Sequence, residues 1–95
     1  MKIQITLTCR LAPKLGQIKL IPQPENAYDD EAIAVFVPTP VDGWTQDGYV
    51  AAYYKIRKRG HWSAGRLVDH IPSSGQIATV IGPNVAEVEL LEVKA

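Results

Sequence analysis

The chain has 95 residues, of which 46% are hydrophobic and 21% charged, proportions typical of a folded domain rather than a disordered segment. Ten basic and ten acidic residues cancel, which excludes a strongly basic protein, and a single cysteine excludes a disulfide framework. No apolar run approaches the roughly 20 residues of a membrane-spanning helix, and the first ten residues lack the apolar stretch of a signal peptide. We therefore expect one cytoplasmic domain covering residues 1–95, with no membrane partner.

Period-two alternation and β-branched residues predict six strands. They cover residues 3–8, 17–21, 32–37, 48–51, 76–81 and 86–93. Pro13 should end the first strand, because proline cannot donate a hydrogen bond within a sheet. Residues 32–37 are almost all apolar, which is typical of a strand covered on both faces.

A short helix is predicted between the fourth and fifth strands. Ser63 can cap it by accepting from an N–H group of the first turn. Leu67 and Ile71 would then face the core, and Pro72 would end the helix. Together these elements indicate a mainly β protein: a small, partly open six-stranded barrel of the OB or SH3-like type, with one or two short helices.

Charge cancels over the whole chain but not locally. The six acids of residues 25–47, with no base among them, are Glu25, Asp29, Asp30, Glu31, Asp42 and Asp47. The five bases of residues 55–66, with no acid among them, are Lys55, Arg57, Lys58, Arg59 and Arg66. Tyr53, Tyr54 and Trp62 interleave with these bases, a combination that suits single-stranded nucleic acid because cations neutralise phosphates while rings stack on bases. The alternative is a solvated basic loop that Trp62 anchors to the core.

One segment carries a recognisable pattern. Residues 24–35, PENAYDDEAIAV, are followed after a loop by Gly48-Tyr49-Val50. This resembles the signature of the HIRAN domain family, approximately P-x-N-P-Y-D-x-N-A-I-x-V and then G-Y-[VL]. Residues 63–69 also look like small bacterial members of that family. The resemblance extends from about the second strand to the end of the chain.

The resemblance implies a compact β-barrel that binds single-stranded DNA at its 3′ end, in a repair or replication context. In large eukaryotic members the domain precedes a SWI/SNF-type translocase. Carried over by position, Tyr28 would stack on the terminal base, Asp29 would accept from the 3′-hydroxyl, and Tyr49 would border the pocket. A carboxylate suits this role, since it accepts from a free hydroxyl and repels an internal phosphate.

The chain departs from the family pattern in three ways. Ala27 replaces the usual proline, and Glu31 the usual asparagine. A basic and aromatic pair of the eukaryotic first strand falls near Thr6 and Leu7 here. The segment after Val50 is longer and carries the basic run, so either the basic run compensates for the missing first-strand contacts or the DNA-end site is lost.

Structural roles compete with binding for several of these residues. Asn26 is a turn residue whose side chain can bond the following N–H groups. Tyr28 can pack on the barrel with its hydroxyl exposed. A metal site at residues 29–31, or one built from Cys9, His61 and His70, has no supporting spacing. No catalytic constellation stands out, so we expect no enzyme activity, no cofactor and no metal.

The sequence therefore predicts a DNA-binding module. Tyr28 and Tyr49 would stack on bases, and Asp29 would read the terminal hydroxyl. The phosphates would be held by Lys55, Arg57, Lys58, Arg59 and Arg66, with Trp62 as a further stacking platform. The alternative is an interaction module that uses the same barrel to bind a protein partner or a second copy of itself.

Overall fold

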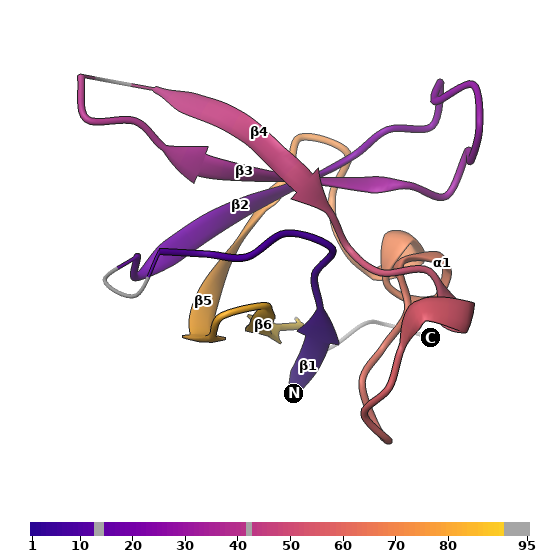
Figure 1. Cartoon of the computed structure of the whole chain (residues 1–95). Helices are drawn as coiled ribbons and strands as arrows, with labels where there is room; N and C mark the ends of the chain where they lie inside the picture. The colour runs from indigo at the N-terminus through magenta and orange to yellow at the C-terminus, as the bar shows by residue number, and fades with distance from the viewer. Residues whose placement is uncertain (13–14, 42, 91–95) are drawn as a thin grey trace.

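The computed structural model describes residues 1–12, 15–41 and 43–90. Its six strands form one antiparallel sheet in the spatial order β1-β6-β5-β2-β3-β4 (Figure 1). The strands are β1 (Lys2–Thr6), β2 (Gln17–Pro22), β3 (Ile33–Pro38), β4 (Trp44–Tyr49), β5 (Gln76–Gly82) and β6 (Val85–Glu89). The short helices are the 3₁₀ turn η1 (Tyr53–Lys55), α1 (Ala64–Leu67) and the 3₁₀ turn η2 (Val68–His70).

The two edges of the sheet approach each other, so the protein is mainly β with a partly open barrel, as predicted. Just beyond β1, Leu7 forms an isolated antiparallel bridge with Val50. The Thr8 N–H donates to the Tyr49 carbonyl and the Ala51 N–H to the Thr6 carbonyl, each at 2.8 Å. These few bonds join the edges without a continuous ladder, and in Figure 1 the end of β4 lies above the end of β1.

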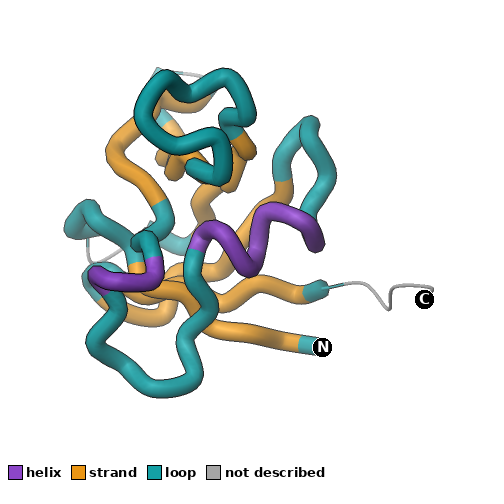
Figure 2. The backbone as a smooth tube through the Cα atoms, turned by 90° about the vertical axis from the view of Figure 1, so that its right-hand side faces the viewer, coloured by secondary structure: helices purple, strands orange, loops and turns teal. Residues whose placement is uncertain are grey.

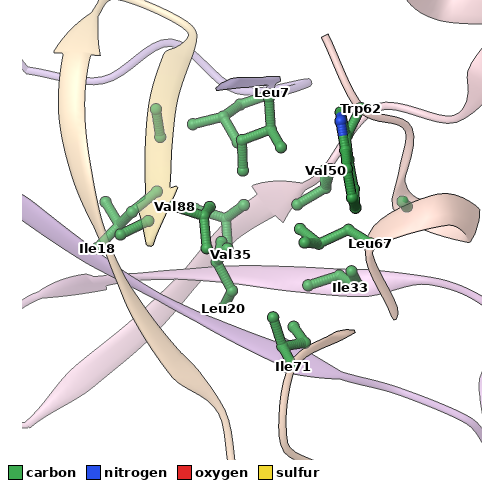
Figure 3. Packing of buried hydrophobic residues seen from close by; sticks show 14 of the residues in the cluster. Leu7, Ile18, Leu20, Ile33, Val35, Val50, Trp62, Leu67, Ile71 and Val88 are labelled. Atoms are coloured by element: carbon green, nitrogen blue, oxygen red, sulfur yellow. The ribbon is translucent and has the colours of Figure 1, made fainter. Parts of the chain in front are cut away.

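The core fills the inside of this barrel (Figure 3). Its largest fully buried side chains are Ile5, Ile18, Leu20, Ile33, Leu67, Val35 and Val88. Alternation along β1 and β2 puts every second residue inside, and α1 adds Leu67 from across the opening. Each such side chain contributes roughly 1.5–3 kcal/mol on burial.

The predicted helix cap and the covered third strand match the structure, whereas the helix differs in length. Ser63 caps α1, since its hydroxyl oxygen accepts from the Arg66 N–H at 3.2 Å. The helix is shorter than predicted, because it tightens into η2 after Leu67. In β3, residues 33–35 are fully buried as predicted for a covered strand, while Phe36 and Val37 are half-buried.

The prediction for the fourth strand was wrong in its position. The strand begins at Trp44, four residues before the predicted start, and pairs with β3 up to Tyr49. β4 is an edge strand whose first four residues are exposed, so Gln46 and Asp47 fit it without an alternating pattern. Pro13, Asp42 and residues 91–93 of the predicted last strand lie outside the described residues.

Candidate nucleic-acid interface

A pocket of about 290 Å³ opens where the turn of residues 23–32, the end of β4 and η1 meet. It brings together four of the predicted site residues, Tyr28, Asp29, Tyr49 and Lys55. We call it the end pocket. The turn and the loop of residues 56–61 project from the same side of the molecule, at the upper and lower right of Figure 1, and Figure 2 shows that side face-on.

Hydrogen bonds to the backbone shape the turn that carries Tyr28 and Asp29. The Asn26 Oδ1 accepts from the N–H groups of Tyr28 at 2.8 Å and Asp29 at 3.1 Å. The Asp29 Oδ1 in turn accepts from the Glu31 N–H at 2.9 Å. The structural role predicted for Asn26 is confirmed, although the segment forms a turn and not a helix. Within the described residues, the second Asp29 oxygen has no hydrogen-bond donor, so it can accept from a ligand.

Three tyrosines surround the end pocket. Tyr28 is 98% exposed and Tyr54 is 74% exposed, whereas Tyr49 is half-buried. The Lys55 ammonium lies 5.8 Å from the centre of the Tyr54 ring. The sequence pointed to Tyr54 only as a neighbour of the basic run, because its place in the pocket depends on the turn of η1.

Closure of the barrel fixes Tyr49. Its N–H donates to the Thr8 Oγ1 at 3.0 Å, and its carbonyl accepts from the Thr8 N–H. Gly48 allows this approach, because a Cβ there would lie only 2.8 Å from the Cys9 Cβ. Burial, reinforced by the nearby Asp47 carboxylate, raises the pKa of the Cys9 thiol. Cys9 is partly buried and packs against the core.

Two further pockets continue from the end pocket. The middle pocket, of about 440 Å³, includes Thr6, Leu7, Arg57 and Lys58, and shares Thr8 and Lys55 with the end pocket. The outer pocket, of about 490 Å³, shares Lys58 with the middle pocket. Its other lining residues are Lys2, Ile3, Gln4, Arg59, Gly60 and His61. Of the five predicted phosphate-binding residues, four thus line these three neighbouring pockets.

Within the described residues, these cations have no carboxylate partner within 4 Å. Across residues 1–12, 15–41 and 43–90, the one ion pair within 4 Å joins the Met1 amino group to Glu89. Arg57 donates to the Tyr54 carbonyl at 3.2 Å, which orients its guanidinium and leaves its other donors available. Exposed cations that no described carboxylate neutralises leave this surface suited to an anionic ligand.

Trp62 and Arg66 line none of the three pockets. Trp62 is only 8% exposed and belongs to the core, and its backbone N–H donates to the Gln4 carbonyl at 2.9 Å. The Arg66 guanidinium lies 3.9 Å from the centre of the Trp62 ring, and His70 meets that ring edge-on. A stacking platform needs an open ring face, which Trp62 does not offer. Its burial agrees instead with the alternative in which Trp62 anchors the basic loop to the core. The Arg66 guanidinium covers one part of the indole ring.

The remaining candidates do not come together. His61 shares a hydrogen bond of 2.7 Å with Thr6, and burial together with Lys58 lowers the pKa of its imidazole. In the part of the chain that the structure describes, no three His, Cys, Asp or Glu side chains gather in a way that could hold a metal ion. None of the described helices is long and apolar enough to cross a membrane. No family model, curated protein or solved structure matches the chain.

Proposed function

We propose that this chain is a non-catalytic module that binds single-stranded DNA at its 3′ end. The observation that carries the proposal is the end pocket, which combines the unpaired oxygen of Asp29 with the rings of Tyr28 and Tyr54. The terminal hydroxyl would donate to Asp29, and the terminal base would stack on an exposed tyrosine. Such a stack is worth roughly 1–3 kcal/mol for any base.

The resemblance to the HIRAN family supports the same proposal. The chain differs from that family mainly in its first strand, and the geometry around that strand is informative. Thr6 and Leu7 stand where eukaryotic members have a basic and aromatic pair. Here Lys55, Arg57 and Lys58 line the middle pocket beside these two residues. The basic run therefore occupies the neighbourhood of the missing contacts, which favours compensation over loss of the site.

The experiment compares three fluorescent ten-residue oligothymidines by anisotropy: one with both ends as hydroxyls, one with a 3′-phosphate and one with a 5′-phosphate. We expect the 3′-phosphate alone to weaken binding, by about tenfold, the low end for a hydrogen bond to a charged group. The oligonucleotide with a 5′-phosphate is the control, because the unmodified strand also has a free hydroxyl at its 5′ end. Weakening by the 5′-phosphate instead would reverse the assigned end.

Asp29→Asn tests the residue assigned to the hydroxyl. The amide oxygen can keep the bond to the Glu31 N–H while the negative charge is lost, so the turn should survive and the discrimination between the ends should fall. Asp30→Asn is the matched control, because this neighbouring acid is exposed and lines none of the three pockets. Equal loss of discrimination in both variants, or no binding by the wild type, contradicts the proposal.

A second candidate function is protein interaction through the edge of β4 at residues 44–47. This strand ends the sheet, its first four residues are exposed, and Trp44 is 41% exposed. An unpaired edge can add a strand from a partner or from a second copy. Light scattering at low and high salt tests it: a dimer that Thr45→Pro disrupts favours this candidate, and a monomer in both salts argues against a homodimer.

A further inference from the structure

The three pockets form an ordered path. The end pocket meets the middle pocket at Thr8 and Lys55, and the middle pocket meets the outer pocket at Lys58. A hydrogen bond between Thr6, in the middle pocket, and His61, in the outer pocket, lies at the second junction. The three pockets therefore neighbour one another in the order end, middle, outer.

The charge of the lining residues rises after the end pocket and then stays level. The end pocket has one acid, Asp29, and one base, Lys55. Among the described residues, the middle pocket has three bases and no acid, and the outer pocket has Lys2, Lys58 and Arg59 with no acid; Lys55 and Lys58 each line two of the pockets. A nucleic-acid strand that ends in a hydroxyl has the same distribution: its terminal nucleoside carries no phosphate beyond it, and every earlier linkage carries one negative charge.

We infer that the path is a three-nucleotide track. The terminal nucleoside occupies the end pocket, the first phosphodiester from that end lies in the middle pocket, and the second lies in the outer pocket. Arg57 then contacts the first phosphate, Arg59 contacts the second, and Lys58 lies between the two. This inference rests on the proposed function and adds to it a footprint, a direction and a separate partner for each phosphate.

The test places one neutral methylphosphonate at a time in the ten-residue oligothymidine with a 3′-hydroxyl. Neutralising the first or the second linkage from the 3′ end should weaken binding by about two- to fivefold each, the range for exposed ion pairs. Neutralising the fourth to the sixth linkage should leave the affinity unchanged. The same loss at every linkage, or a loss only near the 5′ end, would overturn the track.

Two variants then pair each phosphate with its residue. In Arg57→Gln, a methylphosphonate at the first linkage should no longer weaken binding, whereas one at the second linkage still should. Arg59→Gln should show the reverse. Arg10→Gln is the matched control, since this exposed arginine lines none of the three pockets. Circular dichroism checks that each variant keeps the β-sheet. Because Arg57 also donates to the Tyr54 carbonyl, Arg57→Lys is measured beside Arg57→Gln. The lysine variant should retain the loss of affinity at the first linkage.

The outcomes separate the two proposals. Preference for a free 3′-hydroxyl with a uniform phosphate profile keeps the proposed function and refutes the track. Loss of the hydroxyl preference refutes the proposed function, whatever the profile. Local penalties that neither arginine variant changes refute the pairing of residues with phosphates.

Discussion

Replacing Gly48 by alanine should loosen the closure of the barrel. The added Cβ would lie 2.8 Å from the Cys9 Cβ, 3.0 Å from its Sγ and 3.1 Å from the Thr8 Oγ1. Real Cβ atoms essentially never approach within 3.0 Å, and the Cys9 Cβ cannot rotate away because the backbone fixes it. The segment of residues 7–9 must therefore move away from β4.

The cost of Gly48→Ala follows from two contributions. Overpacking of a tight contact costs roughly 1–3 kcal/mol. Weakening the two hydrogen bonds between Thr8 and Tyr49 adds up to about 1 kcal/mol each, close to the net value of a typical hydrogen bond. We expect a loss of about 2–4 kcal/mol, a large share of the roughly 5–14 kcal/mol that stabilise a domain of this length.

Urea unfolding followed by circular dichroism measures this loss. Gly16→Ala is the matched control, because nothing lies within 4 Å of a Cβ at that position, and it should be neutral or slightly stabilising. Since Tyr49 also lines the end pocket, Gly48→Ala should weaken binding of the DNA end as well.

A double-mutant cycle identifies the contact responsible. Cys9→Ala removes the Sγ and leaves the Cβ, so it should barely relieve the cost of Gly48→Ala. Cys9→Gly removes both atoms and should relieve much of it. Equal relief by Cys9→Ala and Cys9→Gly would refute the argument from a fixed Cβ. Full stability of Gly48→Ala would refute the close contact between Gly48 and Cys9.

Other predictions concern the segment after the basic run. Ser63→Ala should lower the free energy of unfolding by about 1 kcal/mol in urea titrations, since it removes the N-cap of α1. Arg66→Gln should lower the melting temperature by uncovering Trp62, at a cost of about 0.5–1 kcal/mol, while DNA affinity stays within twofold of the wild type. The pKa of His61 is lowered by burial and by Lys58, so the unfolded state takes up the proton first; stability should decline as the pH falls below about 6.5, and urea titrations of His61→Gln should lack that decline.

Features that local chemistry controls were predictable from the sequence alone. Alternating residues located β1, β2, β5 and β6, because a half-buried strand repeats every two residues. Ser63 and Asn26 revealed a helix start and a turn, since their side chains bond backbone groups only a few positions away. The separation of acids from bases was likewise visible along the chain.

Contacts between residues distant in sequence settled the remaining features. An edge position made residues 44–47 a strand, and the bridge to Ile5 in β1 made Trp62 a core residue. The contact between Thr8 and Tyr49 joined the two edges of the sheet and placed both residues in the lining of the end pocket. Each of these outcomes is fixed by which surfaces are buried against one another, and a pattern of neighbouring residues carries no information about partners some 40 positions away.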